Sequence, residues 1–308
     1  MTIRSVQSPS AVVMIRPHHF FINPETAADN AFQESGVKNN RSVLAKSAYD
    51  ELTKAADRLQ ENGVNVHVFE DEGTETPDSV FPNNWFSTHA GGHIAIYPML
   101  SSARRKERRA DVIELLKQQY RVQDVVDYSG LEPDGLFLEG TGAMVLDHID
   151  RVAYAVKSNR TDPIALERFC THFNYEPMVF DAADERGVSV YHTNVLMCIA
   201  TSFVLICLDM FKDDDRREEI VQRFVRSGRE VIDLSPDQIR HFAGNALELQ
   251  TQKGLLLALS KTARDSLTTE QIATIEKYAV LLDLDIPTIE KAGGSVRCTL
   301  AGVHLSPR

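Results

Sequence analysis

The chain has 308 residues, of which 43% are hydrophobic and 25% are charged, and its formal net charge is −11. This length and composition are those of a globular protein that buries a core. The negative charge, which no basic stripe offsets, argues against a nucleic acid or an anionic membrane as the partner. The one basic run, Arg104 to Arg109, includes Glu107 and is expected to form a solvated helix face.

Targeting and redox signals are few. The first ten residues, MTIRSVQSPS, lack the apolar core of a signal peptide, and no apolar run reaches the ~20 residues that span a bilayer. We therefore expect a cytoplasmic protein whose four cysteines are reduced thiols, since they show neither a CxxC pair nor metal-ligand spacing. Cys170, Cys198 and Cys207 lie in apolar runs typical of a core, whereas Cys298 follows a glycine pair.

In chain order, a strand is predicted at 11–17 and a helix at 41–62, and four hairpin-like blocks follow. Each block is a β-type run, a short polar or glycine-containing turn and a second β-type run. The blocks begin at Asn84, Gly142, Asn194 and Asn245, at separations of 58, 52 and 51 residues, and a further 53 residues lead to Cys298. Cys298 opens the last predicted strand, CTLAGVHL. A period near 50 residues indicates a circular or stacked repeat architecture.

Helical periodicity follows each complete hairpin, and a short strand follows most of these helices. The helices are expected at 103–119, 160–173, 213–228 and 264–283; the short strands contain VNVHVF, VQDVVDY, PMVFDA and EVIDLS, and the final block has IPTIEK instead. We predict one α/β domain, 1–308, of about five ββαβ units. Its ring is closed by strand 11–17 pairing with strand 298–305. A doubly wound α/β fold is the alternative, but it would not predict the even spacing.

In a closed ring, equivalent positions converge on the axis. The entry of each hairpin carries or adjoins a polar residue: Asn84, Glu139, His192, Asn245 and Cys298. A carboxylate, an imidazole and a thiol brought together suit covalent catalysis, because the imidazole moves protons and the thiolate attacks electrophilic carbon. Each also has an ordinary structural interpretation: a core thiol, a strand-end histidine, or a carboxylate paired within the fold.

Five segments carry a resemblance to a known family: VFPNNWFSTH (80–89), FLEGTGAMVLD (137–147), YHTNVLMCI (191–199), FAGNALEL (242–249) and AGGSVRCTLAGVHL (292–305). In this order they resemble the pentein superfamily of guanidine-modifying enzymes. The nearest group is that of the arginine deiminase-related amidinotransferases and citrulline-utilisation hydrolases. The resemblance implies a five-bladed α/β propeller with a pseudo-five-fold axis, a cysteine nucleophile, and neither a cofactor nor a metal.

Carried over by position, the resemblance assigns three catalytic roles. Cys298 matches the nucleophile that attacks the amidine carbon, and His192 matches the general acid/base. Glu139 matches the carboxylate that binds the substrate nitrogens and orients the imidazole. Typical deiminases have aspartates where this chain has Asn84 and Asn194. An amide offers both a donor and an acceptor, so these replacements favour a neutral ureido group such as that of citrulline. The glycine-rich approach to Cys298 instead resembles enzymes that act on guanidines, and both substrate classes stay open.

The remaining candidates concern the substrate's tail. Arg16 or Arg297 could bind a carboxylate, or each could be ion-paired within the fold; Asn83 and Asn245 are added as substrate-binding candidates. Residues 20–40 are either a lid or a plain surface loop. The predicted function is hydrolysis at the guanidino or ureido carbon of a small arginine-like molecule. The alternatives are amidino transfer and a non-catalytic pentein that binds a macromolecule, and the oligomeric state stays open.

Overall fold

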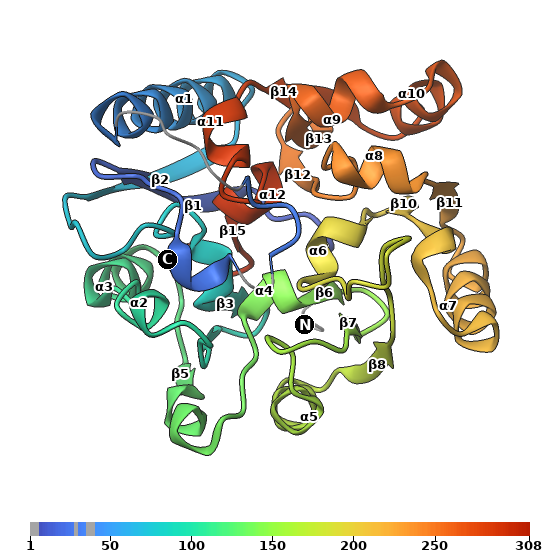
Figure 1. Cartoon of the computed structure of the whole chain (residues 1–308), viewed down its shortest axis with the longest axis horizontal. Coiled ribbons are helices and arrows are strands. Elements are labelled where there is room, and N and C mark those ends of the chain that lie inside the picture. Colours follow the sequence, from blue (N-terminus) through green and yellow to red (C-terminus); the bar gives the residue numbers. More distant parts are fainter. Residues whose placement is uncertain (1–5, 28–29, 35–40) are drawn as a thin grey trace.

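The computed structural model describes residues 6–27, 30–34 and 41–308. Within this part of the chain the strands form five three-stranded sheets. The sheets surround a common centre, with the longer helices on the outside (Figure 1). In every sheet the middle strand pairs antiparallel with one neighbour and parallel with the other. The predicted five-bladed α/β propeller is therefore confirmed, and the doubly wound alternative is wrong.

The first sheet joins the two ends of the chain. Its middle strand, β1 (Ala11–Pro17), runs parallel to β2 (Asn65–Asp71) and antiparallel to β15 (Ala301–Val303). Helix α1 (Arg41–Glu61) links β1 to β2 on the outer side. Ala11 lies opposite Val303, which is the pairing that closes the ring.

The other four sheets repeat one pattern: an antiparallel hairpin, an outer helical segment and a third, parallel strand. The second has β3 (Phe86–His89), β4 (His93–Ile96), α2 (Ser102–Arg105), α3 (Ala110–Gln119) and β5 (Asp124–Asp127). The third has β6 (Met144–Asp147), β7 (Val152–Val156), α5 (Pro163–Phe173) and β8 (Glu176–Phe180). The fourth has β9 (Met197–Ile199), β10 (Phe203–Ile206), α7 (Asp214–Arg226) and β11 (Glu230–Asp233). The fifth has β12 (Leu247–Thr251), β13 (Gly254–Ser260), α9 (Lys261–Ser266), α10 (Thr269–Glu276) and β14 (Val280–Leu284).

Local sequence explains the outer helices. The Asp213 side chain accepts a hydrogen bond from the backbone N–H of Arg216, and thus caps the start of α7. Acidic residues occupy the first turn of α7 and Arg223 and Arg226 occupy its last turn, so both ends complement the helix dipole. The apolar side, with Ile220 and Phe224, is buried against the sheet.

Two sequence predictions were wrong in detail. The predicted helix at 264–283 ends earlier, and its last part is strand β14, because a short apolar run fits either element. The final block was predicted to have IPTIEK in place of a short strand, but that segment contains helix α11 (Pro287–Glu290) and the short strand is β14. The outer strand of the fifth sheet is therefore present, as in the other four.

Short helical turns precede four of the inner strands, where the sequence predicted that strands begin. They are η2 (Pro82–Asn84), α4 (Gly140–Ala143), α6 (Thr193–Leu196) and α12 (Val296–Thr299). Cys298 thus lies in a helical turn, and β15 begins three residues later. The turns place polar residues at the top of the ring rather than within a sheet.

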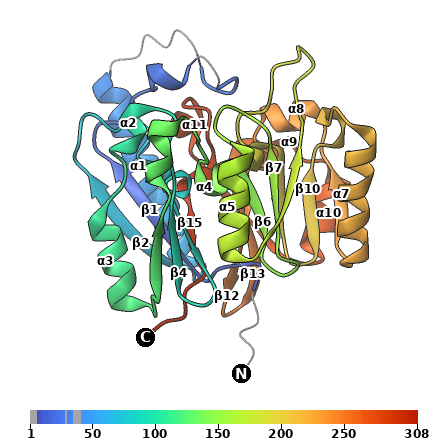
Figure 2. The ribbon, with the colours of Figure 1, turned by 90° about the horizontal axis from the view of Figure 1, so that it is seen from below.

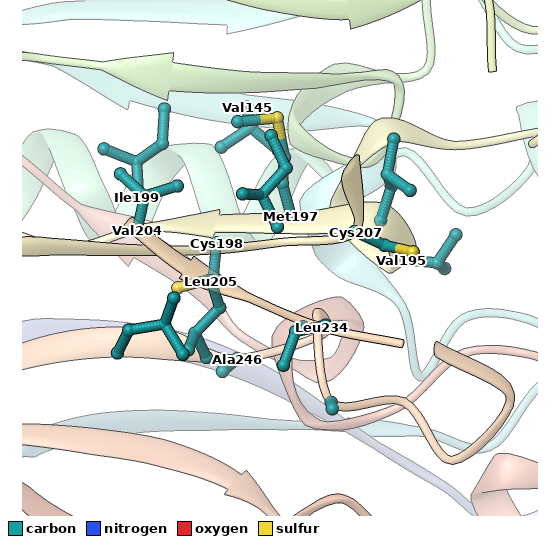
Figure 3. Close-up of a cluster of buried hydrophobic side chains, with 14 of the residues drawn as sticks. Val145, Val195, Met197, Cys198, Ile199, Val204, Leu205, Cys207, Leu234 and Ala246 are labelled. Carbon is teal, nitrogen blue, oxygen red and sulfur yellow. The ribbon is translucent and has the colours of Figure 1, made fainter. Parts of the chain in front are cut away.

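The core lies between the sheets. Figure 3 shows side chains from β6, β9 and β10 packed together, among them Val145, Met197, Cys198 and Leu205. These side chains are apolar because each inner strand is covered by its neighbours on both sides. Among the described residues, no helix has the length and apolar character needed to cross a membrane.

Candidate active site

The helical turns before the inner strands meet at the centre of the ring. Contacts join α4 to η2, α4 to α6 and α12 to η2, and Figure 1 shows α4, α6 and α12 around the axis. A small pocket opens among them. Its lining includes Cys298 and His192 together with Thr26, Asn30, Asp78, Phe81, Asn84, Arg104, Arg160, Tyr191, Ala292 and Gly294. Two of the three predicted catalytic side chains therefore share one cavity.

His192 and Glu139 form a buried pair. Nε2 of His192 lies 2.9 Å from Oε2 of Glu139. Burial would raise the pKa of Glu139, but Arg160, the hydrogen bond from His192 and Arg104 outweigh it, and the net pKa is lowered. An ionised carboxylate only accepts hydrogen bonds, so Nε2 of His192 carries the hydrogen. Burial lowers the pKa of His192 to about 4, against the opposing effect of Glu139. The imidazole is therefore neutral near pH 7, and its Nδ1 can accept a proton.

Glu139 is held on several sides. Oε1 accepts from the backbone N–H of Leu100 at 3.0 Å, and Nη1 of both Arg104 and Arg160 lies 3.5 Å from Oε2. Glu139 is not among the residues that line the pocket. The geometry therefore fits the predicted orientation of the imidazole, but it does not provide the predicted contact with substrate nitrogens.

Two amides face the sulfur of Cys298. Nδ2 of Asn194 and Nδ2 of Asn245 each lie 3.3 Å from Sγ. Donors at this distance stabilise negative charge on sulfur. Asn194 was predicted to contact the substrate, but it does not line the pocket. The reason is that α6 directs the Asn194 side chain toward α12, so both amides contact Sγ of Cys298.

The other three cysteines have a different environment. Burial raises the pKa of Cys170, Cys198 and Cys207 to about 12, and Figure 3 shows Cys198 and Cys207 among apolar side chains. These thiols stay protonated near pH 7, and a protonated thiol is a poor nucleophile. We expect iodoacetamide to label Cys298 before the other three. Peptide mapping after brief alkylation would show this, and equal labelling of all four would contradict it.

The prediction that the basic run, Arg104 to Arg109, forms a solvated helix face is wrong for Arg104. Its side chain is 2% exposed, and its Nε and Nη2 each donate to Glu107 at 3.0 Å. Its Nη1 also donates to Oδ1 of Asn84 at 2.9 Å. Because the buried Glu107 and Asn84 both face inward, Arg104 turns into the pocket. The signal that could have shown this is the Arg–Glu spacing of three within the run.

Asp78 and Arg160 are further pocket residues that the sequence reasoning missed. Asp78 is buried, accepts from Nδ2 of Asn23 at 2.8 Å and lies 3.7 Å from Nε of Arg104. Arg160 is buried with its guanidinium 4.9 Å from the ring centre of Tyr191. Asp78 precedes the apolar pair Val80-Phe81, and a carboxylate beside an apolar run needs a partner within the fold. Nothing in the sequence around Arg160 marks it.

Three other candidates lie elsewhere. Arg16 is paired with Glu70 on β1 and β2, and Arg297 lines a second cavity rather than this pocket. Neither Arg16 nor Arg297 lines the pocket of Cys298. Asn83 accepts from Nδ2 of Asn84 at 3.0 Å but is not in the lining.

In the parts of the chain that the structure describes, no cluster of three or more His, Cys, Asp or Glu residues could hold a metal ion.

Part of the 20–40 segment covers the pocket. Thr26 and Asn30 contribute to the lining, and Nδ2 of Asn30 donates to the carbonyl of Ala292 at 3.0 Å. Figure 2 shows the early segment above the turns, on the side of the ring opposite the N-terminus. Residues 28–29 and 35–40 of the segment lie outside the described part. The described residues thus form part of the pocket wall.

Gly142 has a steric role in α4. A Cβ at this position would lie 2.2 Å from Nδ2 of Asn84 and 2.8 Å from Nδ1 of His192. Both distances are shorter than real contacts permit, so any side chain here would displace one of the two groups. The glycines of the Glu-Gly-Thr-Gly segment therefore allow η2, α4 and α6 to approach one another.

A model of the family described as eukaryotic N,N-dimethylarginine dimethylhydrolase matches residues 16–305. The chain belongs to this family. The family acts by hydrolysis at the guanidino group of arginine derivatives, so the chain is a hydrolase of this kind. Its place in the pentein superfamily, inferred from the motifs, is thereby confirmed. A search of curated proteins found no match.

Several solved structures share the fold. A cysteine-to-serine variant of the N-terminal domain of ArgZ, a cyanobacterial arginine dihydrolase, matches with a TM-score of 0.73 and 17% identity over 95% of this chain and 97% of that one. Unliganded AgrE matches with a TM-score of 0.75 and 19% identity; the match covers 97% of this chain but 40% of AgrE. A histidine-to-glycine variant of dimethylarginine dimethylaminohydrolase, solved as an adduct with S-methyl-L-thiocitrulline, gives a TM-score of 0.63 and 13% identity over 96% and 99% of the chains.

Proposed function

We propose that the chain, as one catalytic domain, hydrolyses the guanidino group of a free arginine-like amino acid through a covalent adduct on Cys298. The observation that carries this proposal is the pocket in which Cys298 meets a neutral His192. Neither the two amides at the sulfur nor the Glu139–His192 pair is needed by a protein that only binds a macromolecule. Cytoplasmic location remains a prediction.

The steps follow from these groups. The Cys298 thiol loses its proton to His192, and the sulfur attacks the guanidino carbon. The C–N bond then breaks, and the departing nitrogen takes the proton back from His192, leaving ammonia (or a methylamine) and an amidino group on sulfur. Water, deprotonated by His192, attacks the same carbon, and the C–S bond breaks to release the ureido product. The sum is one water consumed and one amine released.

The charges in the pocket support a zwitterionic substrate. Asp78 offers a carboxylate for the guanidinium cation, and Arg104 and Arg160 offer two guanidinium groups for a substrate carboxylate. In this proposal Arg104 and Arg160 bind the substrate carboxylate, a role predicted from the sequence for Arg16 or Arg297. Glu107 holds Arg104 by two hydrogen bonds and so fixes the direction of its guanidinium.

A screen of small molecules tests this function. Arginine, methylated arginines, citrulline and agmatine are offered, and ammonia, methylamines, citrulline, ornithine and urea are measured. We expect release of an amine from at least one guanidino amino acid and poor use of agmatine, which lacks the carboxylate. Activity on agmatine equal to that on arginine would contradict the assignment of Arg104 and Arg160. Transfer of the amidino group to an added amine, in place of hydrolysis, would favour the amidinotransferase alternative.

Asn84 is the basis for a second hydrolytic step. It lines the pocket as a neutral amide, and an amide can accept and donate to a ureido group. Citrulline formed by the first hydrolysis could then be attacked in turn, giving ornithine, carbon dioxide and a second ammonia. The structurally similar ArgZ is described as an arginine dihydrolase. Two ammonia molecules per arginine in the screen would support this extension, and one would limit the enzyme to deimination.

Asn84→Asp is expected to shift preference toward guanidino over ureido substrates. The new carboxylate attracts a cation and must be desolvated beside a neutral group. A charge-assisted contact contributes about 1.5–3 kcal/mol, so the ratio of kcat/KM values should change about tenfold or more. The measurement compares the best guanidino and ureido substrates in the wild type and the variant. Asn194→Asp is the matched control: it faces the sulfur, so it should lower activity on both substrates without changing their ratio. An unchanged ratio in Asn84→Asp would remove Asn84 from substrate selection.

A further inference from the structure

A second, small cavity of about 40 Å³ lies inside the ring and shares no lining residue with the pocket of Cys298. The inner strands of all five sheets, β3, β6, β9, β12 and β15, contribute to its wall. It therefore lies on the central axis. Gln7 lines it and donates from Nε2 to the carbonyls of Leu146 and Ile199, at 2.9 and 3.0 Å.

Among the described residues that line this cavity, Arg297 alone carries a full charge. Arg297 lines it, and its Nη1 donates to the carbonyl of Leu300 at 3.0 Å. In the described part of the chain no carboxylate lies within ion-pair distance of Arg297, and no Asp or Glu lines the cavity. The buried Arg104, Arg160 and Arg229, by contrast, each have an acidic partner, which for Arg229 is Asp147 at 2.8 Å. Residues 1–5, MTIRS, include no acidic side chain.

The neighbouring polar groups do not neutralise this charge. His148 and His304 stack with ring centres 3.9 Å apart and line the same cavity. Burial, together with nearby positive groups, lowers the pKa of both rings, that of His304 to about 3. They are therefore neutral near pH 7 and supply polar N–H groups without negative charge. Arg297 is partly buried, so its guanidinium is partly removed from water, and this desolvation without a counter-charge costs free energy that a bound anion would offset.

We propose that the central cavity binds a small inorganic anion, such as chloride, against the guanidinium of Arg297. The cavity holds the positive charge that an anion requires, and its wall has no competing carboxylate. A small monovalent ion fits because the free volume of the cavity is only about 40 Å³. Binding of the anion compensates the charge of Arg297, which lies in the same turn, α12, as Cys298, and thereby stabilises the fold.

Thermal unfolding in matched salts tests the proposal. The melting temperature of the wild type is measured in sodium chloride and in sodium gluconate, whose anion is too large for the cavity, at equal ionic strength. We expect a saturable rise in Tm with chloride of about 2–4 °C. Arg297→Met should remove this rise, and Arg226→Gln, at an exposed position in α7, should keep it. No difference between the salts in the wild type, or a rise retained in Arg297→Met, would overturn the proposal.

Crystals of the wild type give an answer that does not depend on whether Arg297→Met folds. After a soak in sodium iodide, anomalous diffraction is expected to show iodide in the central cavity within hydrogen-bonding distance of Arg297. Added chloride should reduce the peak. A cavity that contains only water next to Arg297, with iodide bound elsewhere, would overturn the proposal.

Discussion

Replacing Cys298 by serine is expected to abolish turnover, to below about a thousandth of the wild-type rate, while the fold stays intact. A serine hydroxyl is not ionised near neutral pH, and two amide donors at 3.3 Å do not make it a nucleophile comparable to a thiolate. The measurement is kcat on the best substrate from the screen, with Tm as the check on folding. A variant that keeps a tenth or more of the activity would remove Cys298 from the mechanism.

Cys207→Ser is the matched control for this substitution. Its thiol lies in the apolar core, so a hydroxyl there should cost about 1–3 kcal/mol of stability through an unsatisfied polar group. Activity per folded molecule should not change. The two variants thus separate loss of chemistry from loss of stability, since each makes the same chemical change in a different environment.

His192→Ala is expected to lower kcat/KM by roughly 10²–10⁴-fold, the usual contribution of a general acid/base. The pH profile adds a second test. Because burial lowers the pKa of His192 to about 4, the neutral base persists to low pH, and wild-type kcat/KM should fall only as the pH drops through about 4. The residual activity of the variant should lack this acidic limb.

His241→Ala is a suitable control, since His241 is exposed and interacts locally with Asp237. It should leave both the rate and the pH profile unchanged. An acidic limb that persists in His192→Ala would assign the titration to another group. A variant with wild-type kinetics would exclude His192 as the base, whatever the fold.

The repeat of the hairpins was enough to predict the five sheets. It also predicted that the first residues of the hairpins meet at the axis of the ring. Spacing reports topology directly, because each unit adds nearly the same length of chain. Spacing does not report the local path: the turn of α12 placed Cys298 before its strand rather than in it, and α6 directed Asn194 to the sulfur. Such details depend on how neighbouring turns pack, which no single segment encodes.

The charged side chains that line the pocket were not predicted from the sequence. Arg104 lies in a run that by composition is typical of a solvated helix face, and it is buried only because Glu107, Asn84 and Glu139 meet it from three directions. These partners are between 3 and 35 residues away in the chain. A buried charge is identified by its partners in space, so Asp78 and Arg160 also became visible only in the assembled ring.

Trapping of the covalent adduct tests whether Cys298 is the nucleophile. A His192→Gly variant, in which hydrolysis of the adduct lacks its base, is incubated with S-methyl-L-thiocitrulline and analysed by intact mass spectrometry and peptide mapping. Attack by sulfur releases methanethiol and leaves the rest of the molecule on the protein. We predict a single adduct on the peptide that contains Cys298, and none after the further change Cys298→Ser. No adduct, or an adduct on Cys170, Cys198 or Cys207, would contradict the proposed mechanism.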